Sequence, residues 1–352
     1  MAYFTYEGIG IRGISAAVPK RIFNNYTDNI NFNEEDAKAI VDKTGIWQRR
    51  VADDTTCSSD LCFAASESLI SGMKIERSEI DVLIFISQTP DYRMPATAIL
   101  LQERLGLPKS CAAFDINLGC SGFIYGLNLA FSLSQQSGIR KVLLLNGETR
   151  TKVYSFKDRQ TGFLFGDAGT ACIIEKDPQF GSSHFVLDSD GSKSDYIKIK
   201  SGGYRNPTTI DSLIEKVHED GSTHSDEQGS MDGAGVFEFV ITQVPKQFKE
   251  TLRYSGNTIE DIDYFVFHQA NRFMNEHLLK KLKLDPEKVP FSLDKYGNTS
   301  SVSVPLTIVS ELTGKLNTVK QKLIISGFGV GLSIGSAVIS MNDPFIGDIV
   351  EV

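Results

Sequence analysis

An apolar strand pattern gives way to a helical one in the segment Phe114-Asp115-Ile116-Asn117-Leu118-Gly119-Cys120-Ser121-Gly122. This pattern places the Cys120 thiol at the start of a helix, where unpaired N–H groups and the helix dipole favour a thiolate. The glycines on either side leave room for a ligand to approach the sulfur. A buried, inert thiol is the usual alternative, and Cys111 and Cys172, in apolar surroundings, are expected to be of that kind. Cys120 is the candidate nucleophile.

Two polar segments farther along the chain also follow strand-like runs: His268-Gln269-Ala270-Asn271 and Tyr296-Gly297-Asn298-Thr299-Ser300. Among the five histidines, only His268 ends a strand and opens a helix, as Cys120 does. His184, His218 and His224 lie in or beside a polar region and are expected to be exposed. Asn298 alone would be interpreted as a turn or helix-cap residue. Together, a cysteine, a histidine and an asparagine at strand ends suffice for thiol-based acyl chemistry.

The run Ser326-Gly327-Phe328-Gly329-Val330-Gly331-Leu332-Ser333-Ile334-Gly335 does not fit G-x-G-x-x-G, and a strand pattern follows it. A dinucleotide fingerprint or a phosphate loop is therefore disfavoured. A glycine turn that presents backbone N–H groups to a developing oxyanion is the better interpretation.

The composition is that of an ordinary globular protein, with 352 residues, 41% hydrophobic and 23% charged. The formal net charge of −8 argues against nucleic acid as a partner. No run of 18 apolar residues exists, so no membrane insertion is expected, and the first residues do not read as a signal peptide. Five cysteines without metal-site spacing indicate free thiols in a reducing cytoplasm and no metal.

The order of the predicted elements repeats. Strands are expected near 8–17, 82–87, 112–117, 142–146 and 170–175, with helices near 58–71, 95–105 and 121–137. A second set of strands is expected near 184–188, 264–267, 291–293, 323–326 and 333–340, with helices near 236–254, 271–284 and 301–313. Both sets read β-α-β-α-β-α-β-β, which predicts a duplicated α/β unit with halves at 1–178 and 179–352. Residues 193–229 are turn-rich and polar, and indicate either a functional lid or a surface excursion.

Motifs along nearly the whole chain resemble those of a known family. They are Thr44-Gly45-Ile46 with Arg49-Arg50, Asn117-Leu118-Gly119-Cys120-Ser121-Gly122-Phe123, Asp158-Arg159, Phe165-Gly166-Asp167-Ala168-Gly169, His268-Gln269-Ala270-Asn271, Gly297-Asn298-Thr299-Ser300 and Gly327-Phe328-Gly329-Val330-Gly331. With them the chain resembles the ketoacyl-acyl-carrier-protein synthase III branch of the thiolase-like condensing enzymes. The His-Gln-Ala-Asn run is specific to that branch.

The resemblance implies a thiolase-like fold, a five-layered α-β-α-β-α sandwich, in a homodimer. It implies that Cys120 accepts an acyl group, after which a malonyl thioester on acyl carrier protein loses CO2 and its carbanion attacks the acyl-cysteine. His268 and Asn298 would donate hydrogen bonds to the malonyl thioester carbonyl, and the backbone N–H groups of Cys120 and Val330 would hold the oxyanion. No tightly bound cofactor is implied, since acyl-CoA and acylated acyl carrier protein (acyl-ACP) are substrates.

The resemblance also suggests binding residues. For the substrate they are Arg159, Lys43, Asn271, Gly233, Met94 and Phe237, and for the carrier protein they are Lys280 and Lys281. Met94 stands where the family often has a phenylalanine that reaches across the dimer to cap the acyl pocket.

Several binding positions depart from the family pattern. Ala39 replaces a tryptophan that stacks on the adenine of coenzyme A, Lys43 replaces an arginine, and Ala234 replaces a pantetheine-contacting asparagine. Glu238 and Phe273 replace basic residues that dock the carrier protein. These departures predict that acetyl-CoA is not the preferred donor.

Three other functions share features with this sequence. An acyltransferase could move the acyl group from Cys120 to an oxygen or nitrogen acceptor without decarboxylation. A papain-like hydrolase shares the Cys-His-Asn set, but the signature Cys-Gly-Ser-Cys-Trp is missing from the sequence. A non-catalytic scaffold would be expected to lose Cys120, His268 or Asn298.

Overall fold

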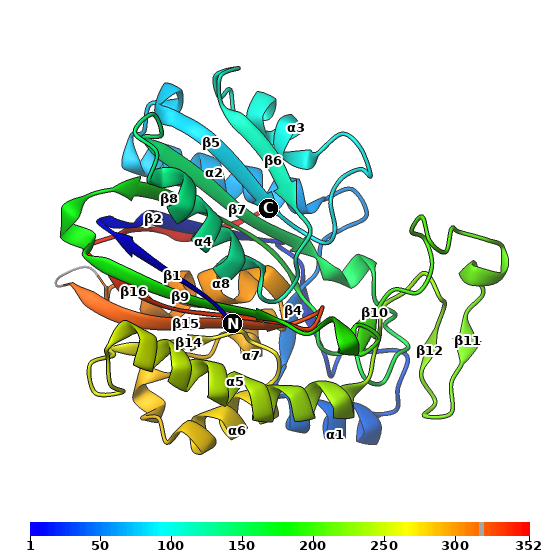
Figure 1. The fold of residues 1–352 in the computed structure, drawn as a ribbon. Helices are drawn as coiled ribbons and strands as arrows, with labels where there is room; N and C mark the ends of the chain where they lie inside the picture. Colours follow the sequence, from blue (N-terminus) through cyan, green and yellow to red (C-terminus); the bar gives the residue numbers. More distant parts are fainter. Residues whose placement is uncertain (317–319) are drawn as a thin grey trace.

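A computed structural model describes residues 1–316 and 320–352. Two mixed β-sheets form its frame (Figure 1). The six-stranded sheet has the order β17 (Phe345–Glu351), β2 (Ile9–Val18), β8 (Asp167–Lys176), β7 (Lys141–Thr149), β5 (Ile80–Ile86) and β6 (Ala112–Ile116). The five-stranded sheet has the order β1 (Ala2–Glu7), β9 (Ser182–Ser189), β16 (Ser333–Met341), β15 (Gln321–Gly329) and β14 (Tyr264–Phe267).

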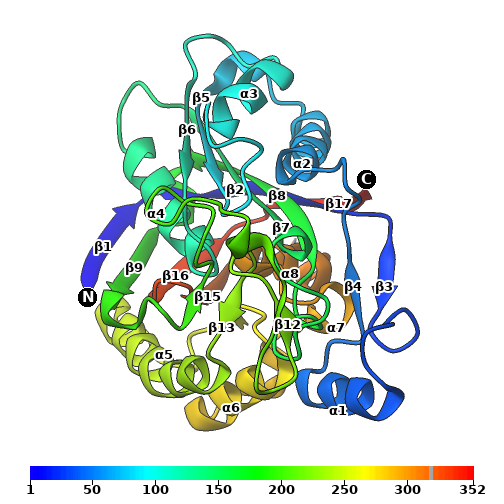
Figure 2. The ribbon, with the colours of Figure 1, turned by 90° about the vertical axis from the view of Figure 1, so that its right-hand side faces the viewer.

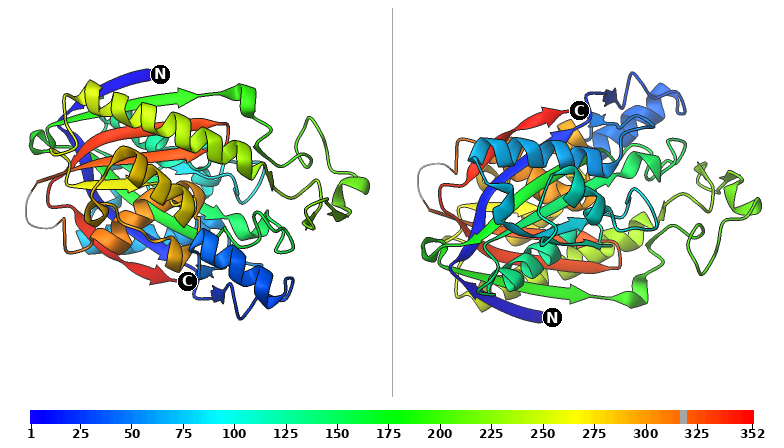
Figure 3. Two further views of the ribbon diagram at one scale, coloured as in Figure 1. Left: turned by 90° about the horizontal axis from the view of Figure 1, so that it is seen from below. Right: turned by 90° about the horizontal axis from the view of Figure 1, so that it is seen from above.

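Helices fill three layers around these sheets (Figures 1 and 3). The outer face of the six-stranded sheet is covered by α2 (Ser58–Met73) and α3 (Thr97–Arg104). The space between the sheets holds α4 (Gly122–Ser134) and α8 (Ser303–Leu312), and the outer face of the five-stranded sheet is covered by α5 (Gly233–Ser255) and α6 (Arg272–Leu282). The result is the predicted five-layered α-β-α-β-α sandwich.

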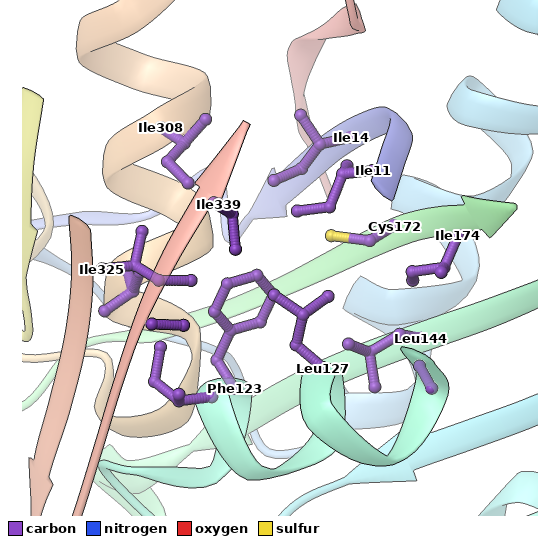
Figure 4. Close-up of a cluster of buried hydrophobic side chains, with 14 of the residues drawn as sticks. Ile11, Ile14, Phe123, Leu127, Leu144, Cys172, Ile174, Ile308, Ile325 and Ile339 are labelled. Atoms are coloured by element: carbon purple, nitrogen blue, oxygen red, sulfur yellow. The ribbon is translucent and has the colours of Figure 1, made fainter. Parts of the chain in front are cut away.

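The central layer holds the main hydrophobic core (Figure 4). Phe123 and Leu127 of α4 pack among residues of both sheets, including Ile325 and Cys172. A helix between two sheets must be apolar nearly all round, which explains the run of large apolar residues after Cys120. Cys172 and Cys111 are buried, as expected.

The two ends of the chain cross between the sheets. Strand β1 pairs antiparallel with β9 in the five-stranded sheet, while β17 pairs parallel with β2 in the six-stranded sheet. The N-terminal strand therefore belongs to the sheet formed mainly by the second half of the chain, and the C-terminal strand belongs to the sheet formed mainly by the first half. The division into halves at residues 178 and 179 stays a prediction.

The strand expected near 291–293 does not form. The helix α7 (Leu293–Tyr296) begins there instead. A side chain satisfies the preceding backbone, since the Ser292 N–H donates to Gln269 Oε1 at 3.1 Å. The Ser292 side chain is held as well, with its hydroxyl 2.7 Å from Thr307 Oγ1. Pro290 also lacks the N–H that a strand ladder requires.

Residues 193–229 form an arm that projects from the body of the molecule (Figures 1 and 3), and Figure 2 views the molecule from the side on which the arm projects. Two short ladders lie in or next to this arm: β10 (Ile197–Lys198) pairs with β13 (Ser230–Met231), and β11 (Lys216–Val217) pairs with β12 (Thr223–His224). The expectation that His224 is exposed was wrong. It is buried because its ring stacks on His218, and its Nδ1 lies 3.1 Å from an oxygen of Asp158.

Helix α1 (Glu34–Thr44) lies in the sequence between two short strands, β3 (Ile22–Asn24) and β4 (Gln48–Arg50), which pair antiparallel. Asn33 caps α1 by accepting a hydrogen bond from the Asp36 N–H. None of the helices formed by the described residues has the length and apolar character of a membrane span.

Candidate active site

The structure brings Cys120, His268 and Asn298 to one cavity, although they lie far apart in the sequence. Cys120 follows β6 and precedes α4, His268 follows β14, and Asn298 follows α7. All three are buried, with Cys120 6% exposed. The cavity contains about 480 Å³ of empty space, part of it open to solvent.

The surroundings of Cys120 favour its thiolate. Burial by itself raises the pKa of the thiol. The charge and a hydrogen bond of His268, the charge of Arg150 and a hydrogen bond from Ser300 outweigh burial and lower the pKa to about 6. Burial raises the pKa of Cys62 and Cys172, with no comparable opposing charge. Cys120 is therefore suited to nucleophilic attack near neutral pH.

A hydroxyl group holds the His268 ring in place. His268 Nδ1 lies 2.6 Å from Ser303 Oγ, and that oxygen also lies 2.9 Å from the carbonyl oxygen of Ser300. The ring meets Phe328 edge-on, with centroids 5.5 Å apart. These contacts fix the ring while His268 lines the cavity.

Asn298 serves both the turn and the cavity. Its Oδ1 accepts a hydrogen bond from the Ser300 N–H at 2.9 Å, which is the turn role that its sequence context predicts. Its Nδ2 lies 3.4 Å from the carbonyl oxygen of Ala270, so one of its two amide hydrogens remains for a ligand. Ser300 has a φ of 52°, and its hydroxyl oxygen lies 3.8 Å from Cys120 Sγ.

The glycine turn meets the cysteine from the opposite side. A Cβ added to Gly329 would lie 2.8 Å from Cys120 Sγ, so only glycine allows this approach. Val330 lines the cavity. Within the part of the chain that the structure describes, the backbone N–H groups of Cys120 and Val330 donate no hydrogen bond. They are therefore available to an oxyanion.

Comparisons with known proteins agree with this geometry. Family models for the 3-oxoacyl-[acyl-carrier-protein (ACP)] synthase III and for its C-terminal part match residues 114–191 and 252–341. The beta-ketoacyl-[acyl-carrier-protein] synthase III of Caldanaerobacter subterraneus is 35% identical over 331 residues, covering 94% of this chain and 97% of the relative. The chain belongs to the 3-oxoacyl-ACP synthase III family.

Solved structures agree with this assignment. A 3-oxoacyl-(acyl-carrier protein) synthase from Burkholderia xenovorans has a TM-score of 0.94 and 39% identity, covering 100% of this chain and 99% of that one. The synthase III from Thermus thermophilus has a TM-score of 0.82 and 31% identity, covering 95% and 99%. The chain is thus an acyltransferase with the thiolase-like fold of synthase III.

A second, outer cavity leads to the inner one, and both share Leu164, Met231, Asn271 and Met274. The outer cavity has about 1030 Å³ of empty space, partly open to solvent. It gathers most of the predicted substrate-binding residues of this synthase III: Lys43, Arg159, Gly233, Phe237 and Asn271. Ala234 and Phe273, two of the departures, line it as well.

The other predicted binding residues lie outside both cavities. Met94 is 76% exposed and lines neither of them, which leaves it free to contact another molecule. Lys280 and Lys281 are exposed in the last turn of α6, where Lys281 Nζ donates to the carbonyl oxygen of Ile241 at 2.7 Å.

Sequence reasoning missed three residues of the site. Ser300 touches the sulfur from within a motif that was recognised, but only Asn298 was singled out there. Glu148 and Arg150 lie at the end of β7, fully or almost fully buried. The available signal was a pair of charged residues where an apolar strand ends, a position like those that identified Cys120 and His268. Among the described residues no cluster of His, Cys, Asp or Glu could hold a metal ion.

Proposed function

We propose that this synthase III carries an acyl group on Cys120 and condenses it with a malonyl thioester of acyl carrier protein. The observation that carries the proposal is a thiol with a pKa of about 6 in one cavity with His268 and Asn298. The Cys120 thiolate attacks the donor thioester carbonyl, forming a carbon–sulfur bond. The donor's own carbon–sulfur bond breaks, and its thiolate leaves and takes up a proton.

In the second half-reaction the malonyl carboxylate leaves as CO2, and its bonding electrons form an enolate. The enolate carbon attacks the acyl carbonyl, and the Cys120 sulfur leaves with its electron pair. His268 and the remaining Asn298 amide hydrogen stabilise the enolate oxygen, while the N–H groups of Cys120 and Val330 stabilise the tetrahedral oxyanion. Removing a single donor of this kind typically costs about 2.7–4 kcal/mol.

Ser303 allows His268 to take both roles. A hydroxyl has one proton to donate. When Ser303 donates to the Ser300 carbonyl, it accepts from Nδ1–H, and Nε2 is free to accept the thiol proton. When Ser303 donates to Nδ1, Nε2 carries a proton that it donates to the enolate. The two contacts, at 2.6 and 2.9 Å, support both arrangements.

The outer cavity supports a carrier-protein donor. Arg159, the expected adenine partner, is held by two hydrogen bonds to Asp36 at 2.7 and 3.1 Å. Ala39 and Ala234 offer neither an aromatic ring nor an amide. An acyl chain on carrier protein would thread through the same cavity, with Lys43, Asn271, Gly233 and Phe237 along the pantetheine and Lys280 and Lys281 contacting the carrier's acidic surface.

The protein is proposed to act as a cytoplasmic homodimer. Strand β6 ends the six-stranded sheet with one edge unpaired within the described residues, which supports edge-to-edge pairing with a second copy. Met94 would then reach the partner's acyl pocket. Sedimentation should give about twice the chain mass of 38.8 kDa, and a fully active monomer would contradict this assembly.

The test of the proposed reaction follows CO2 and product together. Enzyme, acyl donors and malonyl-ACP carrying a labelled carboxylate are mixed, and labelled CO2 and 3-oxoacyl-ACP are measured. Both should form in equal amounts and vanish in Cys120→Ser, whereas the buried control Cys111→Ser should keep them. Transfer of the acyl group to an alcohol or amine without CO2 would favour the non-decarboxylating acyltransferase instead.

A further inference from the structure

The cavity that contains Cys120 also contains a buried cation, Arg150. Its side chain is 4% exposed and lines the cavity together with Tyr154 and Phe165. The guanidinium lies over both rings, 5.4 Å from the centroid of Tyr154 and 5.6 Å from that of Phe165. A guanidinium stays ionised in a protein, so this wall of the cavity carries a full positive charge.

The residues around Arg150 leave part of its hydrogen-bonding capacity unused. One NH1 hydrogen bond reaches Gln88 Oε1 at 3.2 Å, and NH2 lies 3.5 Å from the Tyr154 hydroxyl. Nε is buried and has no hydrogen-bonding partner among the described residues. A buried donor without a partner is costly, so a ligand that accepts from it would gain binding energy.

The nearby carboxylate of Glu148 does not form a hydrogen-bonded ion pair with Arg150. Glu148 Oε2 lies 3.9 Å from Arg150 NH1, beyond hydrogen-bonding distance. Its oxygens instead accept from the Gln88 N–H, the Thr89 hydroxyl and the Ser301 hydroxyl at 3.2–3.3 Å. Burial raises the pKa of Glu148 to about 7 despite the opposing charge of Arg150, so near neutral pH it is only partly ionised.

Acylation changes the charge balance of the cavity. Before it, the Cys120 thiolate faces Arg150. Afterwards the sulfur is a neutral thioester, and the negative charge has left with the donor's thiol carrier. A hydrocarbon acyl chain would leave Arg150 among apolar walls without that charge, whereas a chain ending in a carboxylate would replace it and offer a bidentate acceptor.

We propose that Arg150 selects an acyl donor whose chain carries a carboxylate, the half-thioester of a dicarboxylic acid. The inference rests on the proposed function, because it names the acyl group that Cys120 takes up. It assigns Arg150 as the residue that binds the far end of that group.

The experiment compares donors of equal length on one small carrier. Succinyl-, glutaryl- and adipyl-pantetheine are compared with butyryl-, pentanoyl- and hexanoyl-pantetheine and with monomethyl glutaryl-pantetheine. Acylation of Cys120 is followed by intact mass, without malonyl-ACP, at pH 9, and the ratio of two donors within one variant cancels any difference in thiol ionisation between variants. At least one dicarboxylic donor should exceed its neutral counterpart tenfold or more in kcat/KM. Arg150→Leu should remove that advantage, and Arg150→Lys should keep part of it.

Two results would overturn the assignment: a wild-type preference for the neutral donors, or an Arg150→Leu variant that slows every donor by the same factor. The second result would show that Arg150 stabilises the Cys120 thiolate and does not bind the acyl chain. Should Arg150→Leu fail to fold, Arg150→Gln takes its place, and the wild-type donor ratio decides in either case. Failure of every donor to acylate Cys120 would instead contradict the proposed function.

Discussion

His268 Nδ1 lies 2.6 Å from the Ser303 hydroxyl oxygen, and this contact decides which protons the imidazole can hold. We predict that Ser303→Ala slows condensation about tenfold or more, because Nδ1 loses its donor and the enolate-stabilising tautomer of His268 becomes less populated. Acylation of Cys120 should change less than threefold. Single-turnover rates of the two half-reactions measure this.

The matched control is Ser15→Ala, which removes another buried serine hydroxyl, one that donates to the Ala65 carbonyl far from the cavity. It should affect thermal stability but neither half-reaction. Equal losses in both half-reactions of Ser303→Ala would show that the serine supports the fold of the site rather than a tautomer.

Cys120 should react with iodoacetamide before the other four cysteines. Its pKa is about 6, so the rate should rise with pH through a midpoint near 6 and level off above pH 7. Cys111, whose pKa burial raises to about 11, should stay unlabelled under the same brief treatment. In Arg150→Leu the midpoint should move upward, because a nearby positive charge is removed. Peptide mapping after timed labelling checks both statements, and first labelling of Cys57 would contradict them.

The roles of His268 and Asn298 in the two half-reactions should be distinguishable by the pH dependence of their alanine variants. Each alanine variant should lose condensation by a hundredfold or more, since each removes an enolate donor. Asn298→Ala should still acylate Cys120 at pH 7. His268→Ala should acylate slowly at pH 7 and faster as the pH rises, because the pKa of the thiol goes up without the imidazole and a growing fraction then ionises. An acylation rate in His268→Ala that does not rise with pH would indicate a proton-transfer role in the first half-reaction.

The nucleotide of coenzyme A should contribute little to donor binding. Ala39 on α1 offers no ring, Ala234 in the outer cavity offers no amide, and Arg159 is paired to Asp36, so the stacking that is worth about 1 kcal/mol or more elsewhere is largely missing. We expect kcat/KM for acetyl-CoA and acetyl-pantetheine to agree within about threefold, with acyl-ACP donors faster than both. A large advantage of acetyl-CoA would show that other residues replace the missing contacts.

The positions of Cys120, His268 and Asn298 were predictable from local patterns. Cys120 and His268 stand where apolar strands end, and strand ends of an α/β fold meet at the same edges of the sheets, so side chains there converge. Asn298 was predicted from a strand that does not form, and it follows the helix α7 instead. The alternation of short strands and helices predicted sheets covered by helices, and the family resemblance implied the five layers.

Other features depend on contacts that no local pattern contains. The run at 291–293 looks apolar enough for a strand, yet a side chain distant in the sequence satisfies its backbone. His224 lies in a polar segment but is buried against His218 and Asp158. Arg150 resembles any charged residue after a strand, and its burial follows only from the packing of Tyr154 and Phe165 around it.

The most direct measurement of the central claim is a single turnover traced by isotope. Cys120 is first acylated with a chain labelled at its carbonyl carbon, and excess donor is removed before malonyl-ACP is added. The label should leave Cys120 at the rate at which CO2 appears and should be found at the 3-oxo carbon of the acyl-ACP product. Loss of the label to water or to another acceptor, with the malonyl group intact, would contradict the account.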